Sequence, residues 1–179
     1  MPTFSAATFR TLGSAATTQN LFSLWNNGAN RVVRIRRIVM QMDATAVLTA
    51  VMPLIKTSRV SSAPGAGITL TKAVWDSSGV ASHADVTAKG ACSSDGGSLT
   101  AITGTPGDII WQQYGMRLHT AVGQVLGLDN NVLTAISESF PLVLRSGEGI
   151  IVHVVAAATT SNPNTNHYFV QCAWDEDVS

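Results

Sequence analysis

The sequence is short of charged residues, and this shortage limits what its surface can bind. Only 12% of the 179 residues are Asp, Glu, Lys or Arg, against about 25% in an ordinary soluble domain. The formal net charge is zero, whereas proteins that bind nucleic acid or anionic membranes normally carry a basic excess. We therefore expect neither a nucleic-acid partner nor a membrane partner. A surface so poor in charge is covered by small polar residues or is buried against other subunits.

Long apolar runs and cysteines are also scarce. No apolar run approaches the roughly 20 residues that a membrane-spanning helix needs. The first residues lack the basic region and apolar core of a secretory signal, so cytoplasmic synthesis is the default expectation. The two cysteines, Cys92 and Cys172, are too few for a disulfide framework in a chain of this length. A single bridge between them is left open, although Cys172 lies in an apolar strand pattern and is expected to pack as a small hydrophobic residue.

Motifs for catalysis and metal binding are missing as well. No His-x-His pair, no Gly-x-Ser-x-Gly elbow and no Gly-rich phosphate loop with a Lys occurs. His83 and Asp85 could supply two ligands from one strand face, but two ligands do not make a metal site. Nothing in the sequence brings two carboxylates together for glycoside hydrolysis. The sequence therefore predicts no catalytic residues, no metal and no cofactor.

What the sequence does contain is period-two alternation of apolar and polar residues, rich in Val, Ile and Thr and interrupted by turn clusters. Because these strands do not alternate with helices, the sequence predicts an all-β fold. The expected architecture is a single antiparallel β-sandwich, jelly-roll-like, with long loops rich in Ser, Gly, Ala and Thr. Strands are expected at residues 20–25, 31–42, 47–56, 68–71, 73–75, 141–144, 150–158 and 167–174.

The chain reads as one domain, since 179 residues suffice for one sizeable core and barely for two. Residues 1–19 are assigned to an N-terminal arm, residues 20–174 to the sandwich and residues 175–179 to an acidic C-terminal tail. Residues 57–140 form a loop-rich middle. Within it, residues 109–140 have apolar side chains at helical spacing, but their glycines would each weaken a helix by about 1 kcal/mol. We expect strands there, with at most one short helical turn.

Alternation also assigns faces to two of these strands. In the Arg-rich strand, Val33, Ile35 and Val39 are expected on one face, with Arg34 and Arg36 on the other. In the last strand, four residues share an apolar face that seals the core. These residues are Tyr168, Val170, Cys172 and Trp174.

The Arg-rich strand is the one place where charge is concentrated. Its cationic residues are Arg31, Arg34, Arg36 and Arg37. They form either a solvated face, which also deters edge pairing, or a set of partners for carboxylates. The acidic tail offers such partners at Asp175, Glu176 and Asp177. Because a guanidinium binds a carboxylate through two parallel hydrogen bonds, both groups are candidate intersubunit contacts, and pairing within the chain is the open alternative.

The four tryptophans could provide stacking platforms for a sugar, because an aromatic ring offers a large apolar face. Trp25 and Trp174 fit the core faces of strands, and we interpret them as packing residues. Trp75 and Trp111 lie nearer the predicted loops. These two are the candidate ligand-facing aromatics.

Two stretches carry a resemblance to known proteins. Residues 22–38, FSLWNNGANRVVRIRRI, read as a strand, an Asn-Gly turn and an Arg-rich strand. Residues 141–151, PLVLRSGEGII, are followed by a closing strand that ends in AWDE at residues 173–176. Together they resemble small jelly-roll structural proteins of tailed bacteriophages, of the capsid decoration (cement) or head-fibre type. The likeness lies at the two ends of the chain and leaves residues 57–140 unmatched.

This resemblance implies a β-sandwich that assembles as a homo-oligomer, commonly a trimer, on the surface of the virion head after synthesis in the host cytoplasm. Its partners would be further copies of itself and a major capsid or other virion protein. The sequence thus predicts a non-enzymatic virion structural protein, a capsid decoration or cement subunit. The alternative is a receptor- or glycan-binding component of a fibre or tail with the same fold, and an enzyme on this scaffold is the least favoured hypothesis.

Overall fold

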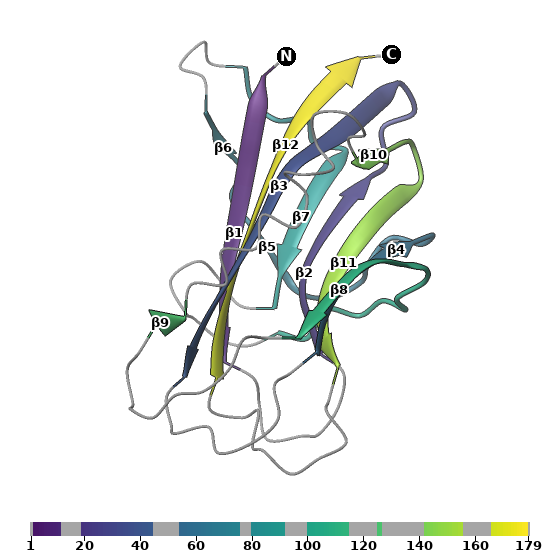
Figure 1. Cartoon of the computed structure of the whole chain (residues 1–179). Coiled ribbons are helices and arrows are strands. Elements are labelled where there is room, and N and C mark those ends of the chain that lie inside the picture. Colours follow the sequence, from purple (N-terminus) through teal and green to yellow (C-terminus); the bar gives the residue numbers. More distant parts are fainter. Residues whose placement is uncertain are drawn as a thin grey trace.

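The computed structural model describes residues 2–11, 19–44, 54–75, 80–91, 100–114, 125–126, 142–155 and 166–178. Within these residues all regular structure is strand, and no helix occurs. The strands form two six-stranded sheets that pack face to face around a shared core (Figure 1). The predicted all-β class and antiparallel β-sandwich are therefore confirmed, while the jelly-roll connectivity stays a prediction.

Sheet A joins segments that are far apart in the sequence. All of its pairings are antiparallel. The last long strand of the chain lies between the first strand and the Arg-rich strand, so that segments from both ends of the chain meet in one sheet (Figure 1). The spatial order is β10 (Leu142–Leu144), β3 (Arg31–Ala44), β12 (Asn166–Val178), β1 (Thr3–Thr11) and β6 (Ala73–Val74), and β9 (Val125–Leu126) pairs with β3.

Sheet B is also antiparallel throughout. Its central strands β2 and β11 bury almost every side chain, on both faces. The spatial order is β5 (Ile68–Thr69), β7 (Val86–Gly90), β2 (Gln19–Asn26), β11 (Glu148–Val155), β4 (Leu54–Val60) and β8 (Ile109–Tyr114).

Most of the predicted strands that can be compared occur close to their expected positions. The strand expected over 47–56 overlaps β4 from Leu54 onward, and β4 runs on to Val60; residues 45–53 lie outside the described residues. In the ambiguous stretch 109–140, the described parts are the strands β8 and β9. The remainder of that stretch, and with it the expected helical turn, lies outside the described residues.

Two boundaries drawn from the sequence differ in the structure. Residues 3–11, which we assigned to an N-terminal arm, form β1 and pair with β12 along their whole length. Asp175 and the following residues, which we assigned to a tail, continue β12 beside β3. β1 was missed because its core-facing residues after Phe4 are the small Ala6 and Thr8, which give a weak alternation signal.

The core lies between the two sheets and is built from the alternating apolar residues of both. The predicted face of β12 is confirmed, since Tyr168, Val170, Cys172 and Trp174 are all fully buried. Each large apolar side chain that is removed from water contributes about 1.5–3 kcal/mol to stability. Cys172 is a free thiol in this core, and burial raises its pKa. Cys92, the other half of the bridge that the sequence left open, lies outside the described residues.

A bulge at Arg36 reverses the alternation of β3. Ile35 and Arg37 lie opposite neighbouring residues of β12, which leaves Arg36 as the extra residue. After the bulge Ile38 is buried in the core, and Val39 is half-buried outside it. The expectation that Val39 shares a face with Ile35 is therefore wrong, because one inserted residue moves every later side chain to the opposite face.

The outer face of sheet B carries a second, smaller apolar cluster, which the segment 100–108 helps to cover. This segment is fixed by Asn20, whose Nδ2 donates to the carbonyl oxygens of Ile102 at 2.9 Å and Gly104 at 3.3 Å. The backbone N–H of Arg59 also donates to the carbonyl of Asp108 at 2.9 Å. The members of the cluster are Trp25, Val60, Ala91, Ile102 and Ile151.

Candidate interaction surfaces

The predicted arginines and carboxylates meet on the outer face of sheet A. Arg34 Nη1 lies 3.0 Å from Asp177 Oδ2, and the guanidinium of Arg36 pairs with Asp175. The other oxygen of Asp175 accepts a hydrogen bond from Thr3 Oγ1 at 2.7 Å. The Asp175 side chain is only 4% exposed, because these neighbours lie over it. For Arg34 and Arg36 the structure thus contains the alternative of pairing within the chain.

The other two arginines are placed differently. Arg31 starts β3 and closes the Asn-Gly turn, where its backbone N–H donates to Gly28 at 3.2 Å and its carbonyl accepts from Asn26 Nδ2 at 3.0 Å. Nε of Arg37 is buried and has no hydrogen-bond partner within the part of the chain that the structure describes. An intersubunit role for any of the four arginines stays a prediction.

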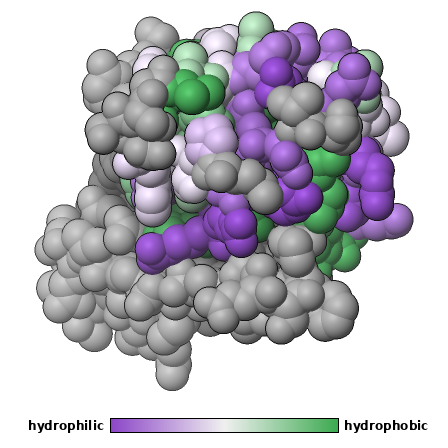
Figure 2. Space-filling view, turned by 90° about the horizontal axis from the view of Figure 1, so that it is seen from above, coloured by the Kyte–Doolittle hydropathy of each residue, from purple (hydrophilic) through white to green (hydrophobic). Residues whose placement is uncertain are grey.

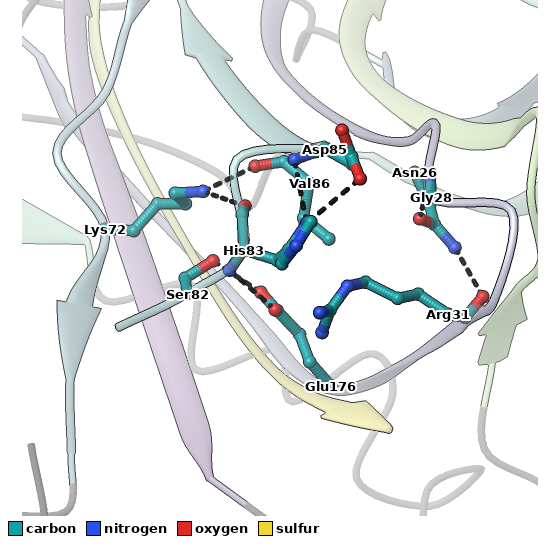
Figure 3. A network of polar contacts seen from close by, with 9 residues as sticks. All are labelled: Asn26, Gly28, Arg31, Lys72, Ser82, His83, Asp85, Val86 and Glu176. Carbon is teal, nitrogen blue, oxygen red and sulfur yellow. Dashed lines mark hydrogen bonds and ion pairs between the residues drawn. The ribbon is translucent and has the colours of Figure 1, made fainter. Parts of the chain in front are cut away.

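Glu176 lies on the inner side of β12, because the alternation that buries Trp174 continues past it. Glu176 is 5% exposed, and its carboxylate accepts hydrogen bonds from the backbone N–H of His83 at 2.9 Å and from the hydroxyl of Ser82 (Figure 3). Trp174 Nε1 donates a further hydrogen bond to this carboxylate at 3.0 Å. Glu176 therefore holds the segment before β7 against the end of β12, and its carboxylate is not a free acidic group of a tail.

Lys72 fastens the same segment from the other side. Its Nζ donates to the carbonyl oxygens of His83 at 2.6 Å and Val86 at 2.7 Å (Figure 3). Burial lowers the pKa of Lys72, and the negative charges of Glu176 and Asp85 partly oppose this shift. Seen from this end of the molecule, hydrophilic residues run across the described surface in a band, with hydrophobic residues at its margins (Figure 2).

His83 and Asp85, which the sequence suggested as two possible ligands, are in contact. Nδ1 of His83 lies 3.0 Å from Asp85 Oδ2 and accepts a hydrogen bond from the Asp85 backbone N–H at 3.3 Å. Among the described residues, no group of three His, Cys, Asp or Glu side chains could hold a metal ion. Within the same residues there is also no helix of the length and apolarity that a membrane span requires.

The two candidate aromatics have different surroundings. Trp75 is 59% exposed, yet it is held in place: its backbone N–H donates to the carbonyl of Thr3 at 2.9 Å, and its Nε1 donates to Ser5 Oγ at 2.8 Å. Trp111 is half-buried and packs against the main core. Trp75 is therefore the one of the two whose ring is largely open to solvent.

Exposed apolar side chains lie at the outermost described strand of each sheet. Val74 in β6 is 36% exposed, and Trp75 follows it. Val80, on the segment that returns from β6, is 54% exposed. At the edge of sheet B, Ile109 in β8 is 49% exposed. At a sheet edge, unpaired backbone groups and apolar side chains can pair with or pack against another polypeptide chain.

A groove of about 350 Å³ lies where the chain crosses from β5 to β6 beside β1. Its polar side chains come from β1, from the crossing segment and from β12, and its apolar floor includes Ala6 and Leu70. Sequence reasoning missed this groove, because its residues are ordinary ones on three separate segments; the one signal near it was Trp75. The polar residues are Ser5, Thr69, Thr71 and Gln171.

His153 is a buried titratable group on the outer side of β11. It is 3% exposed, and its Nδ1 has no hydrogen-bond partner among the described residues. Burial, together with the positive charge of Lys56 on the neighbouring strand, lowers its pKa from 6.5 to about 4. The imidazole is therefore neutral at physiological pH.

No protein-family model matches this chain, and neither a curated protein nor a solved structure matches it.

Proposed function

We propose that this protein is a non-enzymatic structural subunit of a virion, a capsid decoration or cement protein that oligomerises and stabilises the shell. The observation that carries the proposal is the exposure of Val74, Trp75 and Ile109 at the edges of the two sheets. Natural monomers protect such edges with charge or proline, whereas these two edges carry exposed apolar side chains. A surface short of charge, with apolar edges, suits packing against other subunits.

The proposed partners are further copies of the chain, as a trimer, and a major capsid protein at the surface of the head. The resemblance of residues 22–38 and 141–151 to phage decoration proteins supports this choice. In the structure these residues belong to the paired strands β2 and β11 and to β3 and β10, so the two resembling stretches lie next to each other in both sheets.

The test is the mass of the protein in solution, by light scattering, together with cosedimentation with purified particles. We expect a trimer that cosediments, and particles that lose resistance to heating when the protein is removed. Replacing Val74 and Ile109 together by Ser should abolish both associations, whereas the exposed loop substitution Ala101→Ser should leave them intact. A monomer that binds no shell would contradict the proposal.

A second candidate is a receptor- or glycan-binding component of a fibre or tail. It is favoured by the exposed indole of Trp75, which is held by the hydrogen bond from its Nε1 to Ser5, next to the backbone hydrogen bond from Trp75 to Thr3. A screen against a broad set of glycans checks it, and a screen that stays blank at millimolar ligand would count against it.

A further inference from the structure

The groove beside β1 exists because the chain changes sheets there. β5 pairs with β7 in sheet B, and β6 pairs with β1 in sheet A (Figure 1). Between them, the backbone N–H of Leu70 donates to the carbonyl of Ala88 at 2.9 Å, which draws the chain toward sheet B. Within the described residues, β6 pairs with β1 at Phe4 and Ser5 and no further. The groove that follows has a volume of about 350 Å³, within the range of sites for small molecules.

The chemistry of the groove is polar but uncharged. The hydroxyls of Thr69 and Thr71 and the carboxamide of Gln171 can each both donate and accept hydrogen bonds. None of the described residues that line the groove is charged. Lys72 belongs to the same segment, but it is not one of the lining residues, and its ammonium group donates to the carbonyls of His83 and Val86. A ligand that suits this groove carries many hydroxyls and no net charge.

Trp75 offers an aromatic face next to the groove, although it is not itself one of the lining residues. Its Nε1 donates to Oγ of Ser5, a residue that lines the groove. The hydrogen bond and the pairing next to β6 fix the ring, although 59% of the residue is exposed. An aromatic ring held in place without being buried loses little freedom when a ligand stacks on it. The C–H face of a sugar ring is apolar and packs against such an aromatic face, while its hydroxyls meet the polar groups.

We propose that this groove binds one ring of a neutral saccharide, stacked on Trp75 and hydrogen-bonded by Thr69, Thr71 and Gln171. The proposal deepens the second candidate function, on which it rests, and it competes with the shell proposal for the exposed ring of Trp75. The uncharged lining distinguishes neutral sugars from sialylated or phosphorylated ones, since burying an anion without a cationic partner is costly.

The experiment is a calorimetric titration of the intact protein with neutral hexoses, N-acetylhexosamines and their disaccharides, and with sialyllactose as the anionic probe. We expect a neutral sugar to bind with a Kd of about 1 mM, and sialyllactose to bind at least about tenfold more weakly than lactose if lactose binds.

Trp75→Ala should weaken binding of the neutral sugar by about tenfold or more. Ala73→Gln, which puts a longer side chain into the groove without removing a hydrogen bond, should abolish binding even if Trp75→Ala disturbs β6. Val80→Ala, at an exposed residue outside the groove, is the matched control.

The outcomes separate the proposals. A neutral sugar that binds equally to the wild type, Trp75→Ala and Ala73→Gln would overturn the groove and leave the glycan-binding candidate standing. Preferential binding of sialyllactose would overturn the neutral ligand. No binding of any neutral sugar at about 50 mM would overturn both this inference and the second candidate, and it would leave the shell proposal to its own test of mass and cosedimentation.

Discussion

The outer faces of the two sheets are built from the same kind of alternating strand, but they exclude water in different ways. On sheet B, the side chains of Trp25, Val60 and Ile151 form an apolar cluster, and Ile102 from the segment 100–108 packs onto them. On sheet A, charged side chains cover one another, as in the pair of Arg36 and Asp175. One face is covered by a further segment of backbone, and the other by the long side chains of its own strands.

This difference indicates which face stabilises the fold and which one is available to partners. Burial of a large apolar side chain contributes about 1.5–3 kcal/mol, whereas an exposed ion pair contributes about 0.2–1 kcal/mol. The outer face of sheet B is therefore a second core. The outer face and edge of sheet A carry the partly exposed pair of Arg34 and Asp177 and the exposed Trp75, so they are open to partners. On sheet B the corresponding exposed side chain, Ile109, lies at the edge strand β8 and not on the outer face.

The largest expected effect is at the second core. Ile151→Ala should lower the free energy of unfolding by about 3 kcal/mol, because the side chain is fully buried and its removal leaves a cavity. Urea unfolding measures this change. Val39→Ala, at the half-buried position outside the core of sheet A, should cost under about 1 kcal/mol. Equal losses at the two positions would contradict the comparison.

Acid should also destabilise the fold on the side of sheet B, because His153 is buried there in its neutral form. Its pKa of about 4 in the folded protein lies below that of the unfolded chain, which therefore binds more protons between pH 6.5 and 4. Stability should fall as the pH drops through this range, by on the order of 3 kcal/mol in total. Unfolding measured at several pH values checks this. His153→Gln should flatten the slope, and an unchanged slope in His153→Gln would rule out this source.

On β12 the inner and outer carboxylates should differ. Glu176→Ala should cost about 2 kcal/mol, because Trp174 Nε1 and the backbone N–H of His83 lose their acceptor in a buried site. Glu176→Gln keeps one acceptor oxygen and should therefore lose less stability than Glu176→Ala. Thermal unfolding, followed by tryptophan fluorescence, measures both variants. If Glu176→Ala were neutral, the carboxylate would not be holding this end of the sandwich.

The smallest effect is expected at the surface pair of Arg34 and Asp177. A double-mutant cycle to Ala should give a coupling of about 0.5 kcal/mol that falls with added salt, since both side chains are partly exposed. The same variants should then be measured for mass in solution. A change in oligomeric mass without a change in stability would place the outer face of sheet A in an interface between copies.

The residues of the candidate surfaces were only partly predictable from the sequence. The exposed Trp75 was singled out because it ends the short strand predicted at 73–75 and so lies near the predicted loops. Glu176 was expected in a tail, and the alternation of β12 would have placed it inside had the strand been extended past Trp174. The groove could not have been predicted, because its lining comes from β12, β1 and the segment between β5 and β6. Gln171 and Thr69 line the same groove only because the fold places these three segments side by side.

The sequence by itself determined what depends on neighbouring residues: the all-β class, most strand positions, the Asn-Gly turn and the buried face of β12, because period-two alternation and turn chemistry are local. Only the tertiary structure decided what depends on register between distant strands. The bulge at Arg36 moved Val39 out of the core. The pairing of Arg34 with Asp177 joins residues 143 positions apart, and no local pattern specifies which of many possible alignments brings two such residues together.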